Sequence, residues 1–185
     1  MKTVNWIIAF SLANTAFAAE VFFTPGQDCE NQIVNAIAAA KTEVAVAVYS
    51  INNKRIVSAL IDAHKKGIKV RVLTDAVHAA GKSSKVITML NSGLTLRVHS
   101  KHKIMHNKFA VVDKKWAITG SYNWTEPASK YNSENCVTFS ENDIIQAYAQ
   151  QFENLWSTNA EDKSRLKLAK IAEKCKNRLP SSVKR

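Results

Sequence analysis

Hydrophobic and polar positions alternate with two different periods along the first half of the chain. Residues 29–42 and 52–67 repeat apolar positions every three to four residues, and the second run ends at Gly67, which is typical of helices. Residues 43–51 and 68–75 are short, nearly continuous apolar runs, typical of strands covered on both faces. A further helix over 83–93 and a third strand over 94–98 follow. This β-α-β-α-β order predicts a parallel core with helices on both faces.

The pattern changes beyond residue 106. Two strand-like runs, 107–112 and 116–119, are separated only by Asp113, Lys114 and Lys115, which predicts a hairpin. A strand over 135–140, an amphipathic helix over 142–156 and a basic helix over 162–177 follow. We therefore expect an α/β fold with a mixed, largely parallel central sheet, helices on both faces and a basic C-terminal helix. The expected boundaries are 1–18, 19–158 for the domain, and 159–185 for a basic helical extension.

The first eighteen residues have the pattern of a secretory signal peptide. Lys2 precedes a short apolar run, and Ala16 and Ala18 satisfy the small-x-small rule for cleavage after Ala18. A membrane anchor is the alternative, but the run is short and no stop-transfer charges follow it. We expect a periplasmic or secreted protein without a stable membrane span.

Three cysteines remain after that cut, and an oxidising compartment favours disulfides. Cys136 lies in an apolar strand-like run, where a buried free thiol is common. Cys29 and Cys175 lie near the two ends of the mature chain and are a candidate pair for a clasp, but sequence alone does not establish the pairing among the three cysteines.

The net charge of +11 bears on the partner. Residues 161–185 hold nine Lys or Arg against three Asp or Glu, a surplus of six. A polyanionic partner is indicated, either nucleic acid or an anionic lipid surface. The alternative is a charge surplus that serves only solubility.

Four polar side chains interrupt the hairpin pattern. His106 and Lys108 share one side of a strand, and Ser121 and Asn123 share a side just past Gly120, a glycine that permits close backbone approach. Histidine serves as base, acid or nucleophile near neutral pH, while lysine, hydroxyl and amide groups bind phosphate oxygens. If the two pairs meet, they suit a phosphodiester.

The spacing of these residues resembles the signature of the phospholipase D superfamily. The signature positions are filled by His106, Lys108, Asp113, Gly120, Ser121 and Asn123. Glu134 resembles the acidic position that follows the motif. The likeness runs from about residue 21 to 156, and chain length and the single motif copy resemble small exported bacterial endonucleases. Asp113 belongs to the signature, but its place in the turn indicates a mainly structural role.

The resemblance implies a mechanism. His106 would attack phosphorus and form a phosphohistidine, and a second histidine would protonate the leaving oxygen and then activate water. Because the chain carries one motif copy, the second histidine is expected from a homodimer with the active site at the two-fold interface. Lys108 and Asn123 would bind phosphate oxygens with help from Ser121, and Glu134 would orient the imidazole.

Other candidates are weaker. Lys101 and Lys103 precede the motif and are expected to contact substrate phosphates, and Trp124 to stack on a base. Three nearby histidines suggest a metal site, but adjacent lysines would repel a cation, so no metal or cofactor is expected.

The function expected from the sequence is a metal-independent nuclease that acts on DNA, with RNA as a further possible substrate. The alternatives are a phospholipase D acting on phospholipid head groups and a non-catalytic nucleic-acid-binding protein.

Overall fold

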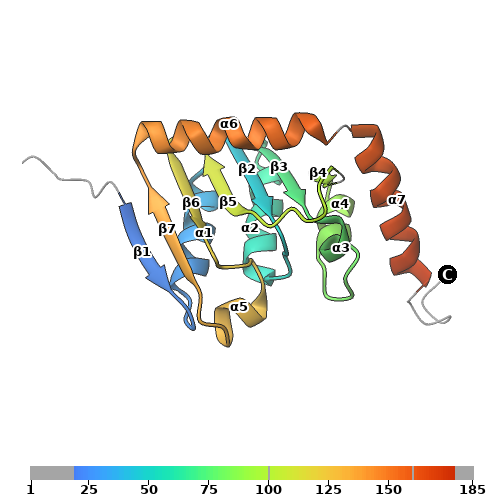
Figure 1. Cartoon of the computed structure of the whole chain (residues 1–185), viewed down its shortest axis with the longest axis horizontal. Coiled ribbons are helices and arrows are strands. Elements are labelled where there is room, and N and C mark those ends of the chain that lie inside the picture. Colours follow the sequence, from blue (N-terminus) through green and yellow to red (C-terminus); the bar gives the residue numbers. More distant parts are fainter. Residues whose placement is uncertain (1–18, 100, 160, 178–185) are drawn as a thin grey trace, which may run out of the picture.

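The computed structural model describes residues 19–99, 101–159 and 161–177. The predicted signal peptide lies outside the described residues. Within them, seven strands form one sheet in the order β1-β7-β6-β5-β2-β3-β4 (Figure 1). The strands are β1 (Ala19–Phe23), β2 (Glu43–Val48), β3 (Lys69–Thr74), β4 (Thr95–Val98), β5 (Lys108–Val112), β6 (Trp116–Gly120) and β7 (Asn135–Phe139).

The sheet is mixed, as expected, but it is not largely parallel. Of the six strand pairings in the described residues, only β2–β3 and β3–β4 are parallel. All four antiparallel pairings involve a strand of the second half of the chain, β5, β6 or β7. Between β5 and β6 a three-residue turn leaves room only for antiparallel pairing. Asp113 and Lys114 take φ of 52° and 53° in that turn, the left-handed conformation that suits a tight hairpin.

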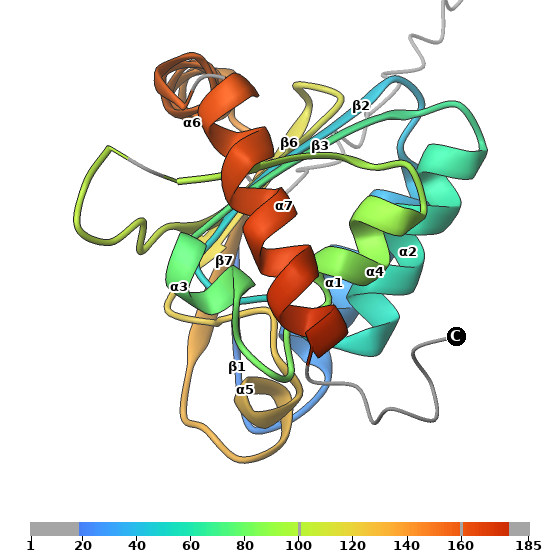
Figure 2. The same ribbon diagram turned by 90° about the vertical axis from the view of Figure 1, so that its right-hand side faces the viewer.

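Helices cover both faces of the sheet, which confirms the α/β class (Figure 2). One face carries α1, α2, α4 and α7, and the other carries α6. The helices are α1 (Asp28–Ala39), α2 (Lys54–Lys65), α3 (Ala76–Ala79), α4 (Val86–Asn91), α5 (Glu126–Lys130), α6 (Asn142–Thr158) and α7 (Glu161–Asn177).

Alternation along the strands divides the core into two layers. In β2, Val44, Val46 and Val48 face α1 and α2, whereas Ala45 and Ala47 face α6. All five are at most 6% exposed, so the sheet is covered on both sides where the sequence shows a continuous apolar run.

A buried arginine joins β3 to the α6 face. Arg71 is 8% exposed, and its guanidinium is paired with Glu43 and Glu153 while lying over the ring of Phe152 at 4.8 Å. The hydrogen bond to Glu153 leads the causes that raise the pKa of Arg71, so this buried charge is fully paired.

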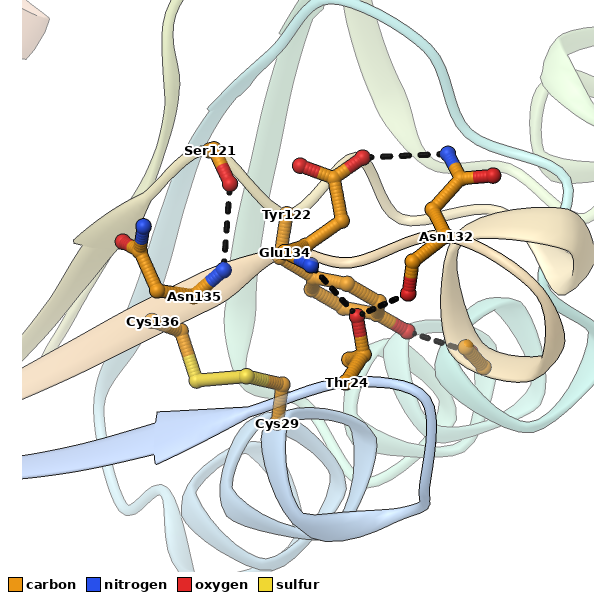
Figure 3. Close-up of a disulfide and its surroundings, with 9 residues drawn as sticks. Thr24, Cys29, Ser121, Tyr122, Asn132, Glu134, Asn135 and Cys136 are labelled. Carbon is orange, nitrogen blue, oxygen red and sulfur yellow. Dashed lines mark hydrogen bonds between the residues drawn. A yellow bond between two sulfur atoms is a disulfide. The ribbon is translucent and has the colours of Figure 1, made fainter.

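The disulfide differs from the expected one. Cys29 pairs with Cys136 across a sequence separation of 107, and Cys175 is free (Figure 3). Strand β1 is the reason, since it pairs with β7 and places Phe22 opposite Cys136, so the first turn of α1 falls directly over β7. Cys175 lies on α7, which packs against β4 at the other end of the sheet.

Helix α7 docks on the body of the protein. Leu168 and Ile171 are 6% exposed and join the larger core layer, and the Ser164 hydroxyl donates to the carbonyl of Val98 in β4 at 3.2 Å. Among the described helices, none has the length and apolar character needed to cross a membrane.

Candidate active site

Strand ends from both halves of the chain meet at one edge of the sheet. Strand β2 pairs antiparallel with β5 so that Val48 lies opposite Lys108, and β6 ends where β7 begins, with Gly120 opposite Cys136. The carboxyl ends of β2 and β3 therefore lie at the same edge as the start of β5 and β7, the lower edge in Figure 1, beside α3 and α5. Ligands of open α/β sheets commonly bind at this kind of edge.

His106 and Lys108 meet there, as the alternation of strand side chains predicts. Lys108 Nζ lies 2.9 Å from His106 Nδ1 and 3.1 Å from Nε2, and it donates to the His106 carbonyl oxygen at 2.8 Å. An ammonium group only donates, so Lys108 can also offer hydrogen bonds to the oxygens of a bound phosphate. The contact places a positively charged group against the imidazole that the motif predicts as the nucleophile.

Lys108 is buried for a lysine, with 7% of its surface exposed. Burial lowers the pKa of Lys108, and the nearby negative charge of Glu134 acts in the opposite direction. A desolvated cation interacts more strongly with a phosphate than a solvated one, because the effective dielectric constant around it is lower.

Tyr49 and His78 complete the surroundings of His106, and sequence reasoning missed both. The ring centroid of Tyr49 lies 4.4 Å from that of His106 and 3.9 Å from that of His78, so the tyrosine stands between two imidazoles. Asp75 fixes this arrangement, since one carboxylate oxygen caps α3 at His78 while the other accepts from the Met105 backbone N–H. The nearest sequence signal was that Tyr49 follows a buried strand, at its carboxyl end.

Gly120 allows the backbone of β6 to approach β7 closely. It has φ of 149°, and a Cβ atom there would lie 2.3 Å from the carbonyl oxygen of Asn135. The next residue, Ser121, accepts a hydrogen bond from the Asn135 backbone N–H at 3.1 Å, beside the Cys29–Cys136 disulfide (Figure 3). The close backbone approach expected at this glycine is confirmed, and it positions Ser121.

Asn123 and Trp124 lie on a segment that pairs with residues 51–53, which follow β2. The carbonyl of Trp124 accepts from the backbone N–H groups of Asn52 and Asn53. Asn123 Oδ1 is one of three buried side-chain atoms without a hydrogen-bond partner within the described ranges. This oxygen only accepts, so any contact of Asn123 with a phosphate oxygen would have to come from its NH₂ group. Trp124 is only 1% exposed and belongs to the core, so its predicted stacking on a base is wrong.

Glu134 lies next to the site but does not bind His106 within the described residues. Its carboxylate accepts from the Asn132 side-chain amide at 3.0 Å, and its backbone N–H donates to the Thr24 hydroxyl (Figure 3). The negative charge of Glu134 acts on Lys108. The expected orientation of the His106 imidazole by Glu134 is therefore not seen within this chain.

Asp113 lies at the opposite end of β5 and is not part of the active site. Its carboxylate accepts from the backbone N–H groups of residues 41–43 and from the Thr42 hydroxyl, at 2.8–2.9 Å. Burial acts to raise the pKa of Asp113, but these hydrogen bonds outweigh it and hold the pKa at about 2. The assignment of Asp113 as catalytic is wrong, and its structural interpretation is confirmed.

Lys101 and Lys103 are exposed on the loop that leads to His106. His99 is buried beneath that loop, and its Nε2 accepts from the His102 backbone N–H at 2.8 Å. In the part of the chain that the structure describes, no three His, Cys, Asp or Glu side chains gather closely enough to hold a metal ion.

The arrangement suits reaction at a phosphodiester. An imidazole and a buried ammonium lie at one sheet edge, with the side chains of Asn123 and Glu134 nearby. The fold and this set of side chains define a hydrolase of the phosphodiesterase class.

Comparison with known proteins gives the family. Residues 33–156 match the family model described as cardiolipin synthase, PLD-like domain. A phospholipase D of Rickettsia conorii is 33% identical over 137 residues, which span 74% of this chain and 68% of that protein. The mitochondrial cardiolipin hydrolase of Canis lupus familiaris is 30% identical over 131 residues, 71% of this chain and 52% of that protein. The chain belongs to the phospholipase D superfamily and is a phosphodiesterase of that family.

Two solved structures share the fold. Nuc from Salmonella typhimurium, described as a phospholipase D family member, superposes with a TM-score of 0.72 at 29% identity and covers 77% of this chain and 95% of its own. NucT from Helicobacter pylori gives a TM-score of 0.69 at 24% identity, covering 75% of this chain and 95% of its own. The matched region ends before α7 in the family model.

Proposed function

We propose that this protein is an exported endonuclease that cleaves nucleic acid without a metal ion, with His106 as the nucleophile. The observation that carries the proposal is the contact of buried Lys108 with both ring nitrogens of His106. The net charge of +11 favours a polyanionic substrate. Lys108 supplies the positive charge that a metal ion supplies in many other nucleases.

The reaction proceeds in two displacements. A ring nitrogen of His106 attacks phosphorus, and the P–O bond to the leaving group breaks as the P–N bond forms. A second histidine gives its proton to the leaving oxygen, then takes a proton from water. That water attacks phosphorus and breaks the P–N bond, which returns both histidines to their starting states.

The second histidine comes from another copy of the chain in this proposal. The motif occurs once in the sequence, so a two-fold dimer would bring two His106 side chains to one site. Heterodimers of wild type with His106→Ala subunits, separated by different affinity tags, should therefore be nearly inactive. Heterodimers with close to half or more of wild-type activity would exclude a shared site.

Export is supported by two features. The N-terminal segment has the signal-peptide pattern, and the Cys29–Cys136 disulfide suits an oxidising compartment such as the periplasm or the cell exterior. Detection of a mature N-terminus at Ala19 in the periplasmic fraction or culture medium would support export, and an unprocessed chain in the cytosol would contradict it.

A second candidate is hydrolysis of phospholipid head groups. The relatives named phospholipase D and mitochondrial cardiolipin hydrolase favour it. The same histidine chemistry would then break the phosphodiester bond to a lipid head group instead of one in a nucleic-acid backbone.

One experiment separates the candidates. Mature protein with its disulfide intact is incubated in excess EDTA with plasmid DNA, and in parallel with cardiolipin or phosphatidylcholine vesicles. His106→Asn serves as the matched control, because it keeps a polar side chain but removes the nucleophile. Nicking by wild type that disappears in the variant supports the nuclease. Head-group release without nicking supports the lipid enzyme, and nicking that survives in His106→Asn contradicts a histidine mechanism.

A further inference from the structure

A groove lies where α7 meets the loop before the motif. A cavity of about 600 Å³ is lined by Lys101, Thr158, Lys163, Leu166 and Lys167. Three of these five residues are lysines and none is acidic. We propose that this groove, here called the α7 groove, is a second binding site for a phosphodiester backbone, outside the catalytic centre.

The walls of the α7 groove are fixed to each other. Lys167 Nζ donates to the carbonyl of His99 at 3.3 Å, which joins α7 to the start of the loop that carries Lys101. The Ser164 hydroxyl, one turn earlier on α7, donates to the carbonyl of Val98. The lysines therefore stand on a docked helix and an anchored loop, so less conformational freedom is lost when a ligand binds.

Charge favours an anion along this side of α7. The helix holds six Lys or Arg and three Asp or Glu, a net charge of +3 by 6 − 3. Asp162 is exposed in the first turn, but it does not line the groove. A repeating anion such as a nucleic-acid backbone can satisfy several separated lysines at once, because its phosphates recur at short intervals.

Packing of α7 favours nucleic acid over a lipid surface. A helix that binds membranes inserts its apolar face into the acyl boundary. Here Leu168 and Ile171 form that face, and both are buried against the protein at 6% exposure. Leu166 is 66% exposed but is a single apolar side chain among lysines. Helix α7 thus presents charge rather than an apolar face to a ligand.

The α7 groove is connected to the catalytic centre through the chain itself. Lys101 lies five positions before His106, and the Met105 backbone N–H is bound to Asp75 at the site. A substrate long enough to occupy both places gains contacts that a small phosphodiester cannot make. This part of the proposal rests on the proposed nuclease function.

The test uses two matched double variants in a His106→Asn background. Lys101→Ala/Lys163→Ala removes two charges from the groove. Lys170→Ala/Lys174→Ala removes two charges from exposed positions of the same helix that do not line it. Lys167 is kept because it bonds the loop. Binding of a labelled 30-base-pair duplex is measured by fluorescence anisotropy over a series of salt concentrations, after urea unfolding has shown that both variants are folded.

The salt slope decides the outcome. Each lost phosphate contact lowers the slope of log K against log salt by about 0.9 for duplex DNA, so the groove variant should lose about 1.8. The control variant should lose less than about 0.5 on the same scale. Equal losses in both variants would show a general charge effect and overturn the site, as would no loss in the groove variant. Reduced binding to phosphatidylglycerol vesicles with unchanged DNA binding would assign the groove to lipid and overturn the proposal.

A kinetic measurement separates failure of the site from failure of the proposed function. With His106 restored, a Lys163→Ala variant, which leaves Lys101 in place, should cleave plasmid DNA at least twofold more slowly at low substrate concentration and hydrolyse bis(p-nitrophenyl) phosphate at the wild-type rate. Equal rates on plasmid would overturn the groove alone. A wild-type enzyme that hydrolyses the small diester but not DNA would overturn the nuclease function instead.

Discussion

Removal of the Cys29–Cys136 disulfide should strongly destabilise the fold. The bond closes a loop with a sequence separation of 107, and the chain-entropy relation gives about 5 kcal/mol at 25 °C for a loop of that size. Folded domains are stable by only about 5–15 kcal/mol, so the loss would be a large share of the total. We expect Cys29→Ala/Cys136→Ala to lower the free energy of unfolding by about 3–5 kcal/mol.

Urea unfolding followed by circular dichroism measures this loss. Wild type reduced with dithiothreitol serves as the control, because it removes the constraint without changing a side chain. The free energies of unfolding of the variant and of reduced wild type should agree within about 1 kcal/mol. The m values of both should exceed that of the oxidised protein, because the unfolded chain becomes less compact. A loss below about 1 kcal/mol in both forms, with the bond verified by mass spectrometry in the oxidised protein, would refute the reasoning. A loss in the variant alone would assign the effect to packing.

Three further predictions concern single positions. Because hydrogen bonding holds the pKa of Asp113 at about 2, its stabilising contribution should be complete above about pH 4 and disappear as the pH falls through 2. Asp113→Asn should flatten this part of the stability–pH curve measured by urea unfolding, and an unchanged curve would contradict the assignment. Gly120→Ala should lower stability by about 2–5 kcal/mol, since its Cβ would clash with the Asn135 carbonyl and its φ of 149° suits only glycine; a loss below about 1 kcal/mol would show that the strands can move apart. Tyr49→Ala should lower kcat at least tenfold by releasing the His106 ring, whereas Tyr49→Phe should stay within about twofold of wild type, and equal losses would point to the hydroxyl instead.

The meeting of His106 and Lys108 could be predicted because it depends only on local alternation. Side chains two apart on a strand share a face whatever the rest of the fold does. The turn at Asp113 could also be predicted locally, from the three residues that separate two strand-like runs. Its position in the turn was enough to indicate a structural role for Asp113. The α/β class and the positions of α1, α2, α4, α6 and α7 could likewise be predicted from periodicity, which requires no knowledge of which strands pair, whereas the short helices α3 and α5 were missed.

Features that depend on pairing between distant segments could not be predicted in this way. Tyr49 reaches His106 only because β2 and β5 are neighbours in the sheet. The disulfide depends on β1, a short strand next to the predicted signal peptide. Val21 and Phe23 of this strand are exposed, so it lacks the pattern of a buried strand. Trp124 enters the core because its backbone pairs beside Ile51, a contact that no local pattern indicates.

The position of α7 has a consequence for shortened forms of the protein. Strand β4 is the last strand of the sheet, and α7 stands at that end of it, with Ser164 bonding a β4 carbonyl (Figure 1). A fragment ending at residue 156, where the family match stops, would keep every side chain of the candidate active site but uncover that edge. Uncovered strand edges recruit other strands, so such a fragment should form aggregates or exchanged assemblies as its concentration rises. We therefore expect α7 to raise the concentration at which the rest of the domain stays free of aggregates, independently of any ligand that the helix binds.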